Sequence, residues 1–161
     1  MSEAAGAAVG VDAARSYGDV AGMIARVKTD RVPIRPVVLV GVGNLGAALL
    51  EYKGFEKEGF EIVAGFDADT KRRRLKTFRQ PVHHIDKLEQ FIRRRHIRIG
   101  IICVPPSAAQ PVTNRLIGAG VSAILNFAPV VLHVPHNVIV SNVNLAIELE
   151  NLSYFRSLAK T

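Results

Sequence analysis

The sequence has few of the residues from which catalytic and metal sites are usually built. It contains one cysteine, Cys103, and no tryptophan, so an internal disulfide and a thiolate metal cluster are both excluded. No stretch approaches the ~20 consecutive apolar residues that a membrane span requires. The Ala/Gly-rich N-terminus is a poor match to a secretory signal. We therefore expect a cytoplasmic protein with no metal site and no membrane association.

Acidic residues are fewer than basic ones, which gives a formal net charge of +7 and an isoelectric point of about 10.0. The basic residues concentrate in two runs, at 71–76 and 93–98. We interpret both runs as solvated surface. A nucleic-acid footprint is the alternative, although no helix-turn-helix pattern or stacking aromatic motif accompanies the charge.

A length of 161 residues suits one domain with a substantial core of its own. Residues 1–16 lack periodicity and are predicted to be disordered, and 17–35 read as a linker helix with a proline-containing connection. The remainder divides into a nucleotide-binding domain at 36–143 and a C-terminal helix at 144–161.

Strand-like and helix-like segments alternate through the domain, which predicts a doubly wound, mostly parallel α/β sheet. The first, fourth and fifth strands are apolar nearly throughout, as expected when helices cover both faces. The predicted strands are 36–41, 60–67, 80–84 (a short edge or third strand), 97–105, 121–127 and 137–143. The predicted helices are 44–53, 85–96, 106–118 and 144–160.

Three glycines follow the first strand in the pattern Gly41-x-Gly43-x-x-Gly46. In this setting the first glycine permits a tight turn, the second lets a pyrophosphate approach the backbone, and the third allows close packing of helix and strand. The candidate phosphate-binding residues are Gly41, Val42, Gly43, Asn44, Leu45 and Gly46.

Asp67 ends the second predicted strand, 21 residues after Gly46, where an acid that binds the adenosine ribose is expected. Its carboxylate favours NAD(H) over NADP(H), because it repels a 2′-phosphate. The arginines at 72–74 leave a phosphorylated nucleotide open as an alternative. Asp69 is interpreted as a turn residue.

Two further segments reach the same edge of the predicted sheet. Val104 and Pro105 are expected to form an apolar wall, and Ser107 to cap the next helix. A second segment supplies an amide, an aromatic ring and a rigid turn, suited to a flat carboxamide ring: Asn126, Phe127, Ala128 and Pro129. Cys103 is read as an inert core thiol within its strand, and the five histidines as surface residues. Because no proton donor and no Tyr-x-x-x-Lys pattern accompany these segments, we expect a sensor and not an enzyme, so no catalytic residues are assigned.

Asn144 is a candidate N-cap for the last helix. Leu145, Leu149 and Leu152 then lie along one helical face, so this helix needs a partner surface. Either its own sheet or a second subunit would supply that surface.

Together, "VVLVGVGNLGAAL", "GFEIVAGFDAD", "VPPSAAQPVTNRLIGAGVSAILNFAPV" and "VNLAIELENLSYF" resemble the bacterial redox-sensing repressors of the Rex family. The resemblance implies a Rossmann domain that binds NADH and NAD⁺ at residues 41–46 and Asp67. It places the nicotinamide end near Val104, Pro105 and residues 126–129. It also implies a homodimer formed by a swapped C-terminal helix, which rearranges when NADH binds.

Rex repressors carry a winged-helix DNA-binding domain ahead of the Rossmann part, and only 35 residues precede the first predicted strand here. We therefore expect a Rex-like sensor core that binds little or no specific DNA itself and signals to a partner regulator protein. It is either a natural short form or a fragment of a longer repressor. The competing hypotheses are a coenzyme A-binding module, a dehydrogenase subunit completed by another chain, and a DNA-binding regulator that uses the basic runs.

Overall fold

A computed structural model of the chain describes residues 33–71 and 76–158. The predicted disordered segment at 1–16, the predicted linker helix at 17–28 and the arginines at 72–74 lie outside the described residues. Two side chains of the last helix, at positions 155 and 157, are also outside the description.

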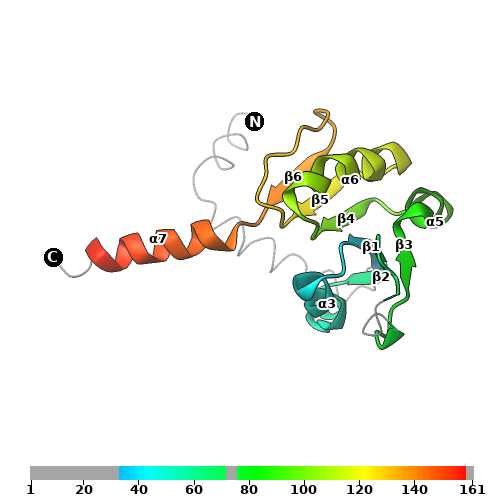
Figure 1. Cartoon of the computed structure of the whole chain (residues 1–161), viewed down its shortest axis with the longest axis horizontal. Coiled ribbons are helices and arrows are strands. Elements are labelled where there is room, and N and C mark those ends of the chain that lie inside the picture. The colour runs from blue at the N-terminus through cyan, green and yellow to red at the C-terminus, as the bar shows by residue number, and fades with distance from the viewer. Residues whose placement is uncertain (1–32, 72–75, 159–161) are drawn as a thin grey trace, which may run out of the picture. The chain divides into compact units, whose positions relative to one another are not determined.

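Six strands form one sheet in the order β3-β2-β1-β4-β5-β6 (Figure 1). The pairs β1–β4, β2–β3, β4–β5 and β5–β6 run parallel, and the order reverses between β1 and β4. This is the order of a doubly wound nucleotide-binding sheet, so the predicted fold class is confirmed. The strands are β1 (Arg35–Val40), β2 (Phe60–Asp67), β3 (Val82–His84), β4 (Ile99–Ile102), β5 (Ala123–Asn126) and β6 (Ile139–Asn142).

Helices pack on both faces of the sheet, because successive side chains of a strand point to opposite sides. In β2, Phe66 contacts Phe91 of α5, whereas a Cβ at the neighbouring Gly65 would meet Leu50 of α3. Figure 1 shows α3 across the sheet from α5 and α6. The helices are α3 (Asn44–Glu51), α4 (Gly54–Lys57), α5 (Leu88–Arg95), α6 (Pro106–Ala119) and α7 (Leu145–Leu158), with a 3₁₀ turn η2 (Ile85–Lys87) before α5.

The central strand β1 explains why the core forms here. Its residues Val37 to Val40 are at most 3% exposed, since helices cover it on both faces. Fully burying side chains of this size contributes roughly 1.5–3 kcal/mol each. A continuously apolar, β-branched segment of this kind is typical of a strand at the centre of such a sheet.

The chain divides into two compact units. Among the described residues, one unit comprises 33–35 and 53–60, and the other comprises 36–52, 61–71 and 76–158. Within the first, the Arg35 amide donates to the Gly59 carbonyl at 3.0 Å, and its guanidinium lies 4.0 Å from the centroid of the Phe60 ring. The cavities and surfaces described below belong to the second unit.

Several predicted boundaries differ from the structure. The strands predicted at 97–105, 121–127 and 137–143 are each only four residues long, although Cys103, Phe127 and Val143, directly after them, still bond to the neighbouring strand. The first helix ends at Glu51, and a short separate helix, α4, follows it. At the edge of the sheet, β6 is mostly exposed, with Ile139 at 73%, and its Val140 packs against the core.

One local prediction is wrong. Ser107 does not cap α6: the N-cap is Pro105, and Pro106 occupies the first helical position, where the missing N–H costs nothing. His83 and His84 lie in the predicted short strand at the sheet edge, where both are half-buried and the His84 side chain is 43% exposed. Within the described ranges, no helix is long and apolar enough to cross a membrane, and no cluster of metal-ligating side chains occurs.

Candidate functional site

A cavity of about 600 Å³ opens at the carboxyl ends of β1, β2 and β4. This is the edge at which open α/β sheets bind ligands, beside the point where the strand order reverses. Its volume lies within the range typical of small-molecule sites. The wall consists of Val40, Gly41, Gly43, Asn44, Leu45, Phe66, Asp67, Ala68, Asp69, Ile85, Cys103, Val104, Pro105, Ala108 and Val112.

Two of the three glycines are required by the packing of the loop that follows β1. Gly41 has φ +95°, and a Cβ there would collide with the Cys103 carbonyl oxygen. A Cβ at Gly46 would collide with the Gly41 carbonyl oxygen, so α3 approaches the end of β1 more closely than any larger residue allows. The predicted turn and close-packing roles of these glycines agree with this geometry.

Gly43 differs from the other two, because a Cβ there would meet no atom within 4 Å. It precedes α3 without a side-chain cap, and the first turn of α3 contains no acidic residue. The first amides of a helix lack partners within the helix, and the helix dipole favours an anion beside them. The first turn of α3 therefore borders the cavity without a side-chain cap from Gly43 and without an acidic side chain.

Asp67 is fixed against this loop by two backbone amides. Its Oδ2 accepts from the Val42 amide at 2.8 Å, and its Oδ1 accepts from the Asp69 amide at 2.8 Å. A carboxylate has about four lone-pair sites, so both oxygens keep acceptor capacity for hydroxyl groups. Asp69 in turn accepts from the Lys71 amide at 3.1 Å, as expected of a turn residue, although it also lines the cavity.

The wall on the β4 side is apolar, with Val104 and Pro105 where the sequence predicted them. Cys103 follows β4 instead of lying within it, and is half-buried in the same wall. Desolvation by burial raises the pKa of its thiol to about 12, so it stays protonated near neutral pH. This agrees with the interpretation of Cys103 as an inert thiol.

The segment predicted to hold a carboxamide ring is organised differently from the expectation. Asn126 is fully buried, and its Oδ1 accepts from the Ala128 amide at 3.0 Å. Its Nδ2 contacts the Asn142 Oδ1 at 3.0 Å and the carbonyls of Ala128 and Val130 at 3.2 Å. The amide thus joins β5 to β6 and shapes the following loop. Asn126, Phe127, Ala128 and Pro129 are not part of the cavity wall.

The apolar members of the wall that sequence reasoning missed include Phe66, Ile85, Ala108 and Val112. Phe66 carried a usable signal, since it directly precedes the acid that ends β2. The others come from a 3₁₀ turn and from a helix face, and no local motif marks them. Conversely, Val42 and Gly46 lie behind the wall, where they support the loop.

The strand order, the glycine turn between β1 and α3, and the anchored acid at the end of β2 define the Rossmann class of nucleotide-binding domains. The sequence model of the CoA binding domain family matches residues 34–130, which is more than half of the chain. The chain belongs to that family.

Curated relatives narrow the resemblance to the Rex repressors. The redox-sensing transcriptional repressor Rex of Streptomyces coelicolor is 50% identical over 119 residues, covering 74% of this chain and 46% of the relative. Rex of Carboxydothermus hydrogenoformans is 50% identical over 118 residues, covering 73% of this chain and 57% of the relative. The chain thus spans about half the length of the curated relatives it matches.

Solved structures give the same resemblance. The complex of RSP with β-NADH matches with a TM-score of 0.72 and 38% identity, over 80% of this chain and 62% of that one. The complex of RSP, a Rex-family repressor, with β-NAD⁺ and operator DNA matches with a TM-score of 0.71. The resemblance to Rex predicted from the sequence is therefore confirmed over the Rossmann portion.

Proposed function

We propose that this chain binds NADH and NAD⁺ in the cavity at the carboxyl ends of β1, β2 and β4, and acts as a redox-sensing core. The observation that carries the proposal is a carboxylate, Asp67, held against a glycine loop whose helix α3 has no side-chain cap. The sequence is also 38% identical to that of the RSP structure in complex with β-NADH.

The geometry supports a role for each part of the wall. The amides at Gly43, Asn44 and Leu45 bind the pyrophosphate. Asp67 accepts from the adenosine ribose hydroxyls, and its charge disfavours a 2′-phosphate. Val104 and Pro105 cover the nicotinamide end. Among the described residues of the wall there is no His, Lys or Tyr to transfer a proton. Bound nicotinamide would supply hydride chemistry, but these residues support binding without turnover.

Titration with NADH, followed by its fluorescence, tests the proposal. We expect micromolar affinity, and Asp67→Ala should weaken it by more than about tenfold, since the ribose contacts of a half-buried carboxylate are charge-assisted. Glu51→Ala removes an exposed carboxylate from the other end of α3 and should leave affinity unchanged. If NADH and NAD⁺ both fail to bind the folded chain, the proposal is wrong.

A second candidate ligand is coenzyme A, favoured by the match to the CoA binding domain family. It would place its diphosphate on the same loop. Calorimetric titration of coenzyme A and NADH against the same sample separates the two. Tighter binding of coenzyme A, with no competition from NADH, would replace the sensor proposal with a coenzyme A-binding module.

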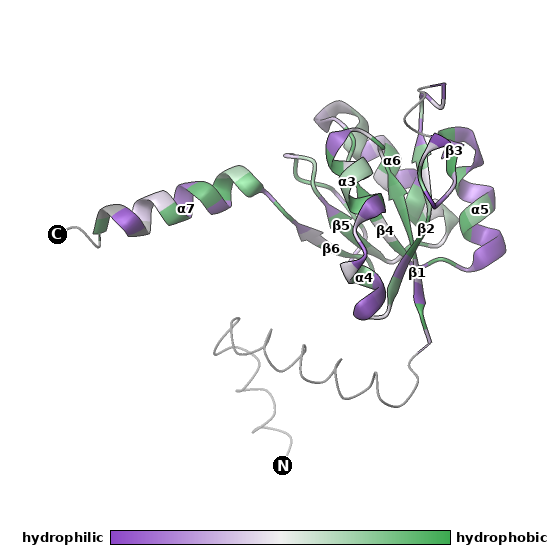
Figure 2. Cartoon of the chain, turned by 90° about the horizontal axis from the view of Figure 1, so that it is seen from below, coloured by the Kyte–Doolittle hydropathy of each residue, from purple (hydrophilic) through white to green (hydrophobic). Residues whose placement is uncertain are grey.

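Helix α7 supports a homodimer. Asn144 caps it through bonds to the amides of Ala146 and Ile147, at 3.1 and 3.3 Å, which confirms the predicted N-cap. At ~100° per residue its apolar side chains form two opposite faces. One comprises Leu145, Leu149 and Leu152, and the other comprises Ile147, Tyr154 and Leu158; all six are at least 50% exposed. Figure 2 shows apolar and polar residues mixed along its length.

A helix with two apolar faces needs cover on both sides, and a second copy that exchanges α7 would provide it. Sedimentation analysis tests this. Leu149→Glu combined with Leu152→Glu should yield monomers, whereas Ser153→Glu, between the two faces, should leave the dimer intact. A monomeric parent chain at tens of micromolar would contradict the proposal.

We further propose that this chain alone has little sequence-specific DNA affinity and that its dimer signals to a partner regulator. Operator DNA is bound in the RSP complex, a chain of which this one covers 59%. Binding to duplex DNA should weaken steeply with salt and show no base preference, as expected of counterion release alone. A preference that survives raised salt would instead favour a DNA-binding regulator.

A further inference from the structure

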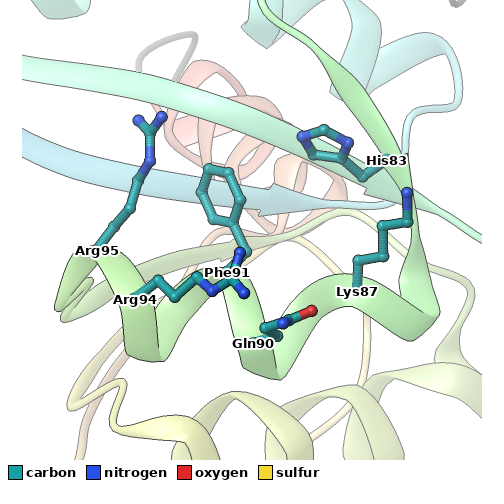
Figure 3. Close-up of a pocket in the computed structure, with 6 residues that line it drawn as sticks. All are labelled: His83, Lys87, Gln90, Phe91, Arg94 and Arg95. Carbon is teal, nitrogen blue, oxygen red and sulfur yellow. The ribbon is translucent and has the colours of Figure 1, made fainter.

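A second cavity, of about 310 Å³, lies on the other side of α5 from α6, between β3 and the outer face of η2 and α5. It shares no lining residue with the nucleotide cavity. Figure 3 shows His83 on the strand facing the side chains that rise from the helix. The lining residues are His83, Lys87, Gln90, Phe91, Arg94 and Arg95.

The spacing of the helical residues places them on one face. Lys87 is three residues from Gln90 and four from Phe91, and Arg94 is four from Gln90 and three from Phe91, which are the spacings of neighbours on a helix surface. Arg93, in the same last turn, is exposed and does not line the cavity. Three basic side chains of this region, Lys87, Arg94 and Arg95, therefore line the cavity, whereas the neighbouring Arg93 does not.

The three cations of this cavity have no acidic partner among the described residues. The two acids nearest in the sequence, Asp86 and Glu89, form no ion pair with these three side chains. Asp86 lies 3.2 Å from the Nδ1 of His84, and Glu89 is bound by the guanidinium of Arg115 on α6. Lys87, Arg94 and Arg95 thus leave an uncompensated positive charge around the cavity.

Helix stabilisation accounts for only part of this charge. Arginines in the last turn of α5 interact favourably with the helix dipole, so Arg94 and Arg95 belong there on structural grounds. Lys87 occupies the N-cap position of α5, where the dipole opposes a positive charge, and it makes no capping bond. Its presence on the same face is not explained by the helix itself.

The side chains are held around the cavity by aromatic packing. The guanidinium of Arg95 lies 5.0 Å from the centroid of the Phe91 ring, and His83 lies 5.6 Å from the same ring. Burial lowers the pKa of His83, and the charges of Lys87 and Arg95 lower it further. The ring of His83 thus lies in the positive potential of Lys87 and Arg95, and an anion that enters the cavity would be attracted by the same potential.

We propose that this cavity binds a small ligand that carries two or three linked phosphoryl groups. Lys87 and Arg95 are eight residues apart, or about 12 Å along a helix axis, a span suited to a phosphate chain more than to a single phosphate. Arginine binds phosphate in a bidentate manner, and Lys87 adds a point charge. The volume is at the lower end for ligand pockets, which favours a small molecule over a nucleic-acid duplex.

Calorimetric titration with sodium tripolyphosphate tests the site directly, independently of dinucleotide binding. Arg94→Gln and Lys87→Gln should each weaken binding by about tenfold, the loss of one charge-assisted contact. Arg93→Gln removes the same charge from the adjacent position and should change affinity by less than about twofold. Equal losses for Arg93→Gln and Arg94→Gln would overturn the proposal.

Nuclear magnetic resonance locates the ligand, because the glycine loop is a competing phosphate site. Tripolyphosphate should shift the ring resonances of His83 and raise its pKa, as the ligand offsets Lys87 and Arg95. Shifts confined to the amides at 43–46 would overturn the proposal. Competition with random-sequence duplex DNA gives a further test. If the DNA displaces tripolyphosphate and all three variants weaken DNA binding equally, the proposal is overturned in favour of a general nucleic-acid surface.

Discussion

Asp67 and Asn126 invite comparison, since each is a polar residue that ends a parallel strand at the same edge of the sheet. Asp67 is half-buried in a cavity wall, next to the glycine loop that precedes α3. Asn126 is 0% exposed and is bonded to two neighbouring carbonyls, an amide and Asn142. Asp67 therefore faces a cavity that a ligand can enter, whereas Asn126 makes its hydrogen bonds within the protein.

The difference follows from what each side chain can satisfy. A carboxylate only accepts, and Asp67 receives one backbone donor from Val42 in the loop after β1 and one from Asp69 in the turn after β2. A primary amide both donates and accepts, so Asn126 can close a network within the protein, between its own loop and the adjacent strand. A polar residue at a strand end is thus a candidate ligand where it lines a cavity, as Asp67 does, and not where it closes a network within the protein.

Removal of the closed network should have the largest effect on stability. Asn126→Ala would leave the Ala128 amide and two carbonyls without their partner, and we expect a loss of about 3 kcal/mol in the free energy of unfolding. Asn142→Ala removes one of these bonds and should cost about 1 kcal/mol. Urea denaturation of both variants measures the contrast. A loss below that of Asn142→Ala would show that the network is not structural.

A neutral replacement at the open position should affect ligand choice more than stability. Asp67→Asn abolishes the charge that repels a 2′-phosphate, so the preference for NADH over NADPH should fall about tenfold, or roughly 1.4 kcal/mol. The free energy of unfolding should fall by only about 1 kcal/mol, since the Val42 amide can still meet an oxygen. Parallel fluorescence titrations with the two dinucleotides give the ratio, and an unchanged ratio would contradict the assigned ribose role.

A purely structural ion pair provides a reference for both positions. The hydrogen bond from Arg115 lowers the pKa of Glu89 below its ordinary value of 4.5. Its contribution is therefore present above pH 4.5 and is lost as the pH falls through the lower folded value. Glu89→Gln should cost about 1 kcal/mol at pH 7 for this partly exposed pair, and the difference from the parent should shrink in acid. Thermal melts at pH 7 and pH 4 test this, and a constant difference would contradict it.

The smallest expected effect on the protein concerns the thiol of Cys103, which lines the cavity beside Asp67 and which we expect to be unreactive. Since burial raises its pKa to about 12, less than one thiol in a thousand is ionised at pH 8 by simple titration arithmetic. Iodoacetamide should alkylate the folded chain far more slowly than the chain in urea. Comparable rates would show that this wall of the cavity is more open than the structure indicates.

The sequence by itself determined the sheet and its ligand-binding edge. Continuous apolar strands, strand-helix alternation, the glycine pattern and the acid after β2 are local features, and each depends on backbone sterics or on burial that a short segment already specifies. Gly41 and Asp67 lie where their spacing predicted them.

Tertiary structure alone decided which candidates face the opening. Asn126 is closed off by Asn142, sixteen residues away, and the second cavity needs His83 from an edge strand opposite a face of α5. Neither pairing has a local signature, because side chains distant in the chain meet only after the sheet has assembled. Whether a polar side chain finds all its hydrogen-bond partners, and whether a charge finds an opposite charge, depends on these long-range contacts, so no single segment of the sequence specifies it.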